Sequence, residues 1–125
     1  MTSSQVDIYS FDVFFEQSNK HVTVPGLSQS NPLHTTQGLS LITFSLDNLS
    51  GAEFATDPIQ WLQDGEPAAL PPWFVLHRHD AWHFALWAFN SAPQTTRHDF
   101  ELSVFYTGQF YSTSDPSIVY DPPSG

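Results

Sequence analysis

The chain contains no cysteine in 125 residues and only three cationic side chains, Lys20, Arg78 and Arg97, against thirteen acidic ones. The absence of cysteine excludes disulfide frameworks, thiol catalysis and cysteine-ligated zinc. The net charge of −10 disfavours nucleic acid and anionic membranes as partners, because binding to either needs clustered cations. We therefore expect an acidic protein whose partners are neither nucleic acid nor membrane.

Long apolar runs and catalytic motifs are missing as well. No apolar stretch approaches the ~20 residues of a membrane-spanning helix, and residues 1–5 lack the basic region and apolar run of a secretory signal. The sequence contains no Gly-x-Ser-x-Gly elbow, no Gly-rich phosphate loop and no His-Glu-x-x-His motif. These observations predict a cytoplasmic protein that is not an enzyme.

Aromatic and turn-forming residues, by contrast, are abundant. The chain has 11 Phe, 4 Trp and 4 Tyr, together with 10 Pro and 6 Gly that divide it into short segments. Frequent Pro and Gly punctuation is typical of a sandwich or a barrel. A length of 125 residues suits one domain, so we predict a single domain over residues 1–125 whose core is held by packing alone.

Alternating apolar residues predict about seven to eight short strands, at the spacing of a β-sandwich. Nine segments carry this pattern, and the two beside Asp57-Pro58 are very short: residues 6–16, 21–24, 39–46, 52–54, 59–62, 73–77, 82–90, 100–111 and 118–120. The fold class is therefore all-β, as an immunoglobulin-like antiparallel β-sandwich. Residues 81–89 could instead form a short helix capped by Asp80, but their aromatic content favours a strand.

Two strands have irregular patterns. In the first, Val6 and Ile8 would point to one side of the strand, whereas Phe11, Val13 and Phe15 would point to the other. This pattern predicts either a bulge near the middle of the strand or burial on both of its faces. In the segment 100–111, a glycine in the middle predicts a bulge or a bend.

The C-terminal segment carries two Asp-Pro pairs, Asp115-Pro116 and Asp121-Pro122. This tail resembles the DP-EP family of small bacterial β-proteins, named for an Asp-Pro followed by an acidic-Pro pair. The second pair has Asp where the family name has Glu, and Tyr120 stands where Asn is expected. The resemblance covers the last third of the chain and implies a small β-domain without implying an activity. Physically, prolines around a final strand limit further pairing along its edge.

A histidine-rich segment is the candidate metal site. His77, His79 and His83 lie close together in sequence, and imidazole ligates zinc, copper and nickel. A two-residue turn at Asp80-Ala81 would put His83 on the opposite face from the other two, whereas a three-residue turn would pair it with His77. Only two of the three converge easily in either case, so a third ligand must come from elsewhere.

Two further features suggest recognition. The triplet Arg-His-Asp occurs twice and contains Arg78 and Arg97, which could form one carboxylate-binding patch if the two loops meet. Trp61, Trp73 and Trp82 are candidate ligand or interface residues, and Trp61 and Trp73, beside the Pro-rich loop, are the expected exposed pair. Trp87 is expected in the core.

These features lead to one main functional hypothesis and two alternatives. The main one is a non-enzymatic β-sandwich that acts by binding another protein or by self-association, since exposed aromatic residues serve protein contacts. The first alternative is a metal-binding module using the three histidines, with a transition metal as cofactor. The second is a lectin that binds a glycan through its tryptophans.

Overall fold

A computed structural model describes residues 6–35, 38–47, 51–90, 95–113 and 116–120 of the chain. Eleven strands occur in this part: β1 (Val6–Glu16), β2 (His21–Thr23), β3 (Leu33–Thr35), β4 (Gly38–Leu46), β5 (Glu53–Gln63), β6 (Glu66–Ala68), β7 (Phe74–Asp80), β8 (His83–Asn90), β9 (Thr96–Tyr106), β10 (Gln109–Ser112) and β11 (Ser117–Tyr120). No helix, and hence none able to cross a membrane, is found among these residues. Asp115, Asp121 and Pro122, on which the DP-EP resemblance rests, lie outside them.

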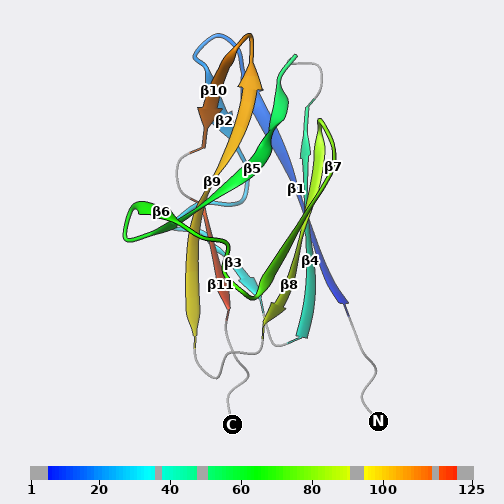
Figure 1. Ribbon diagram of the computed structural model, residues 1–125, viewed down its shortest axis with the longest axis vertical. Helices are drawn as coiled ribbons and strands as arrows, with labels where there is room; N and C mark the ends of the chain where they lie inside the picture. Colours follow the sequence, from blue (N-terminus) through cyan, green and yellow to red (C-terminus); the bar gives the residue numbers. More distant parts are fainter. Residues whose placement is uncertain (1–5, 36–37, 48–50, 91–94, 114–115, 121–125) are drawn as a thin grey trace.

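The strands form two sheets that pack face to face (Figure 1). One sheet has the order β2-β1-β4-β8-β7, and the other has the order β3-β11-β9-β5-β6 with β10 paired to β9. The predicted all-β sandwich is thereby confirmed. The sheets are mixed rather than wholly antiparallel, because β1 runs parallel to β4 and β11 runs parallel to β3.

The strand count exceeds the prediction for local reasons. The short strands β3 and β6 lie outside the predicted segments, in stretches rich in polar residues and proline. Residues 100–111 were predicted as one bent strand, but Thr107 and Gly108 both have positive φ and form a two-residue hairpin turn between β9 and β10. Conversely, the two short segments around Asp57-Pro58 belong to one strand, β5, with a register shift between Phe54 and Ile59.

The first strand is regular, so the predicted bulge is wrong, and in the single chain its second face is not buried either. The pairing of β1 with β4 runs without interruption from Val6 opposite Leu39 to Val13 opposite Leu46. Val13 is therefore buried while Val6 and Ile8 point away from the core and are exposed. Residues 81–89 form a turn and strand β8, which settles the choice between strand and helix in favour of the strand.

The core is an aromatic cluster between the sheets. Phe84 of β8 stacks on Phe44 of β4, with ring centroids 4.8 Å apart, and meets Phe54 of β5 edge to face at the same separation. Phe44 also contacts Phe100 of β9 at 6.3 Å. Such aromatic pairs add to the free energy gained by burying their area, so these contacts join the two sheets without any disulfide.

Candidate functional site

The outer side of the five-stranded sheet carries the largest group of exposed apolar side chains. We call it the apolar face and define it by seven residues of β1, β4, β8 and β7: Val6, Ile8, Leu39, Leu41, Val75, Trp87 and Phe89. Pairing across the sheet places Ile8, Leu41, Trp87 and Val75 in one row, and Val6, Leu39 and Phe89 in the next.

The face follows from strict alternation along the strands. In β8, Phe84, Leu86 and Ala88 point inward and are buried, so the residues between them point outward. Exposure is high for large apolar side chains: Ile8 is 66% exposed, and Val75 and Phe89 are each 51% exposed. Contiguous apolar patches of this kind mark sites of interaction more often than simple surface.

The next two rows of the same side are polar, although Phe14, further along β1, is again an exposed apolar side chain. The row beyond the apolar face pairs Ser10, Thr43, Ala85 and His77, and the hydroxyls of Thr43 and Ser10 are hydrogen-bonded at 3.0 Å. The following row contains Asp12, opposite Ser45 and His83. Hydropathy on this side therefore changes along the strands, from apolar rows to rows that contain acid and imidazole.

The tip of the β7–β8 hairpin is organised by Asp80. Its carboxylate accepts hydrogen bonds from the Trp82 backbone N–H at 2.8 Å and lies 2.8 Å from Nδ1 of His83. The backbone hydrogen bond from Trp82, followed by the hydrogen bond with His83, lowers the pKa of the Asp80 carboxyl. This arrangement fixes the turn at residues 81–82, with a register shift between Arg78 and Asp80.

Neither predicted turn register is right, since Asp80 pairs with His83 and His77 pairs with Ala85. The three histidines nevertheless gather at the tip: the ring centroids of His77 and His79 are 6.4 Å apart, and those of His79 and His83 are 6.5 Å apart. Within the described ranges, no group of three His, Cys, Asp or Glu side chains is arranged to hold a metal ion. Metal binding by these histidines stays a prediction.

The two Arg-His-Asp triplets do not meet. The tip of the β7–β8 hairpin lies beside Phe54, whose N–H donates to the Ala81 carbonyl at 2.7 Å, and Phe54 pairs with Val104. Arg97 lies seven residues back along β9, a distance of about 23 Å at the rise of a strand, so the triplets sit at opposite ends of the sandwich (Figure 1). Residues 78–80 end β7 whereas residues 97–99 lie near the start of β9, so the prediction of one shared patch is wrong.

Both arginines instead form internal hydrogen bonds. Arg78 donates to the carbonyls of Phe54 and Ala55, from Nη2 at 3.0 Å and from Nε at 3.3 Å. These carbonyls lie at the start of the register shift of β5, so the guanidinium joins the two sheets there. Arg97 donates to Asp99 at 3.1 Å and to Ser117 at 3.0 Å, which ties β9 to β11.

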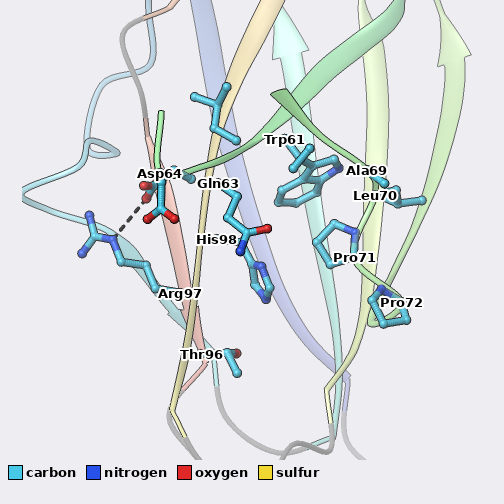
Figure 2. Close-up of a pocket in the computed structure, with 13 residues that line it drawn as sticks. Trp61, Gln63, Asp64, Ala69, Leu70, Pro71, Pro72, Thr96, Arg97 and His98 are labelled. Atoms are coloured by element: carbon cyan, nitrogen blue, oxygen red, sulfur yellow. Dashed lines mark hydrogen bonds and ion pairs between the residues drawn. The ribbon is translucent and has the colours of Figure 1, made fainter. Parts of the chain in front are cut away.

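A second surface feature is an open cavity of about 750 Å³ between the β5–β6 hairpin, the segment that follows it, and the start of β9. Trp61, Pro71 and His98 are among the residues around it (Figure 2). Trp61 is only 4% exposed and stacks on Phe74, with centroids 4.8 Å apart. The prediction that Trp61 is exposed is therefore wrong.

The cavity wall contains buried polar atoms without a protein partner. They are Nε1 of Trp61, Oγ1 of Thr96 and Nε2 of His98. Burial lowers the pKa of His98, while nearby Asp99 opposes that shift to a lesser degree. All three atoms are shielded from solvent. The rest of the lining combines prolines and Leu70 with polar and charged side chains such as Asp64 and Arg97.

The remaining tryptophans are divided between core and surface. Trp73 and Trp82 are half-buried and pack against the core. Trp87, expected in the core, lies instead on the apolar face and is half-buried there. Lectin activity through these side chains stays a prediction.

The apolar face itself was missed from the sequence. The sequence feature that indicates it is the alternation along β1. There Val6 and Ile8 point to the opposite side of the strand from the buried Val13 and Phe15. An unbroken strand with large apolar side chains on both parities has an apolar outer side.

Comparisons with known proteins show no family. No family model matches the chain, and no curated protein matches it. Among solved structures, it is similar to the cysteine protease inhibitor EhICP2 from Entamoeba histolytica, with 10% identity, a TM-score of 0.34, and coverage of 97% of this chain and 100% of that chain. A likeness this distant carries no argument about function, and the DP-EP resemblance stays a prediction.

Proposed function

We propose that the protein is a non-enzymatic association module that self-associates through the apolar face. The observation that supports this most is the row of Ile8, Leu41, Trp87 and Val75, which crosses four adjacent strands without a charged residue. The central parts of protein interfaces are depleted in charged residues and enriched in aromatic ones. Burying this row would remove apolar area from water, which is the main driving force of association.

The proposed fold subclass is immunoglobulin-like, and strand order supports it. The order β1-β4-β8-β7 corresponds to strands A-B-E-D of that fold, and β11-β9-β5-β6 corresponds to G-F-C-C′. A cytoplasmic location is part of the same proposal and is supported by the lack of cysteine.

The test compares two equally exposed apolar residues on different surfaces. Ile8 is 66% exposed on the apolar face, and Phe110 is 67% exposed on the β9–β10 hairpin. We expect Ile8→Glu to abolish association, because it would bury an unpaired carboxylate in the interface, and Phe110→Glu to leave it unchanged. Size-exclusion chromatography with light scattering measures the mass of each variant.

Association that survives Ile8→Glu, or that is lost equally in Phe110→Glu, would contradict the assignment to this face. Circular dichroism of both variants controls for folding. Because both side chains point into solvent, neither substitution should disturb the core.

A further inference from the structure

We infer that the partner of the apolar face is one second copy of the chain, docked face to face about a two-fold axis that runs parallel to the strands between β4 and β8. This inference rests on the proposed self-association and adds its geometry. The described part of the chain holds four long strands on this side, β1, β4, β8 and β7, and this axis places all four against four strands of the second copy.

This axis places residues of the same row opposite one another in the two copies. Rotation about it lays β1 over β7 of the second copy and β4 over its β8, while each row keeps its height. Ile8 then faces Val75 of the second copy, and Leu41 faces Trp87 of the second copy, because all four residues share one row. In the next row, Leu39 faces Phe89 of the second copy. A two-fold interface requires this reciprocity, in which each contact occurs twice.

The polar rows of the same sheet, which contain Asp12 and His83, also favour this axis. With the rows in register, Asp12 of one copy approaches the hairpin tip of the other, where His79 and His83 are exposed. An axis perpendicular to the strands would invert the rows and set Val6 against Asp12 and Phe89 against His83. That arrangement would bury polar groups against apolar side chains, which is costly. The hydropathy gradient therefore disfavours a perpendicular axis whenever all four rows overlap.

The area available is small but sufficient. Four strands about 4.8 Å apart and eight residues long at about 3.3 Å each cover roughly 500 Å² per copy, or about 1,000 Å² in total, near the lower limit for a specific interface. Each copy also carries a net charge of −10, which opposes contact. The expected complex is a reversible dimer, and a two-fold interface closes at two copies.

Because the chain has no cysteine, single cysteine substitutions can test this dimer geometry. Ile8→Cys and Val75→Cys place single thiols on exposed positions of β1 and β7. In the proposed dimer, position 8 of one copy would lie about 10 Å from position 75 of the other, which is the spacing of packed sheets. Position 8 of one copy would lie about 17 Å from position 8 of the other, because the two are also displaced sideways by three strand spacings. The same distance separates the two copies of position 75. The probe is a bis-maleimide chosen to match the spacing of about 10 Å between packed sheets.

An equal mixture of the two variants should give a cross-linked dimer, and each variant alone should give little. A mixture of Ile8→Cys with Phe110→Cys serves as the control and should stay uncross-linked. Strong cross-linking of Ile8→Cys with itself, or association by light scattering without the mixed product, would overturn this geometry while leaving self-association intact. A monomer at every concentration would overturn the proposed function as well.

Discussion

At the scale of single residues, polar side chains in this protein are used mainly to build the fold. Arg78 and Arg97 were candidates for recognition, yet both donate to internal acceptors, Phe54 and Ala55 for one and Asp99 and Ser117 for the other. The sequence could show that arginine recurs beside histidine and aspartate. It could not show which acceptors were near, since these come from strands distant in the chain.

His98 makes one residue-level prediction. Its ring is enclosed by Trp61 and Phe74, with centroids 6.1 and 5.3 Å away, and burial lowers its pKa. The unfolded chain then binds the proton more tightly than the folded one, so stability is full above the unfolded value of about 6.5 and is lost as pH falls through the lower folded pKa.

We expect the midpoint of thermal unfolding to fall between about pH 7.5 and 5, and to fall less in His98→Gln. His79→Gln is the matched control, because His79 is exposed and should keep the wild-type slope. Equal slopes for wild type and His98→Gln would show that His98 is not protected from protonation.

At the scale of elements, β8 has two opposite faces with different roles. Phe84 is buried between the sheets against Phe44 and Phe54, whereas Phe89, on the same strand, is half exposed on the apolar face. Strand periodicity alone separates them, since they differ by an odd number of residues. The sequence could not show which of the two phenylalanines is buried, because large apolar residues occupy both sides of the strand.

A pair of truncations tests this division. Phe84→Ala should lower the free energy of unfolding by about 3–5 kcal/mol, as expected for a phenylalanine removed from a close-packed core. Phe89→Ala should have a much smaller effect on the folding of the monomer, within roughly 1 kcal/mol. Urea denaturation at low protein concentration measures both, and similar losses would mean that the two sides of β8 are not distinct.

Element boundaries show where sequence reasoning was sufficient. The strands rich in alternating apolar residues, such as β4 and β8, were predicted within a few residues. The short strands β3 and β6 were missed because polar residues and proline dominate them, and only their long-range partners make them strands. The parallel pairing of β1 with β4 also depends on the whole topology.

At the scale of the whole molecule, charge and hydropathy act in opposition. A net charge of −10 keeps copies apart, while the apolar face draws them together once they approach. Self-repulsion between exposed charges is screened by salt, with a Debye length of about 10 Å at 0.1 M. Burial of apolar area is not weakened in this way, so the proposed association should strengthen as salt is added.

Sedimentation velocity of the wild-type chain, from about 1 μM to 1 mM at low and moderate salt, shows whether the apolar face holds two copies together. We expect the mass to rise with concentration from the 14.1 kDa of one chain to twice that value and to stop there, with the transition at lower concentration in added salt. A constant 14.1 kDa across the whole range and at both salt levels would contradict this expectation.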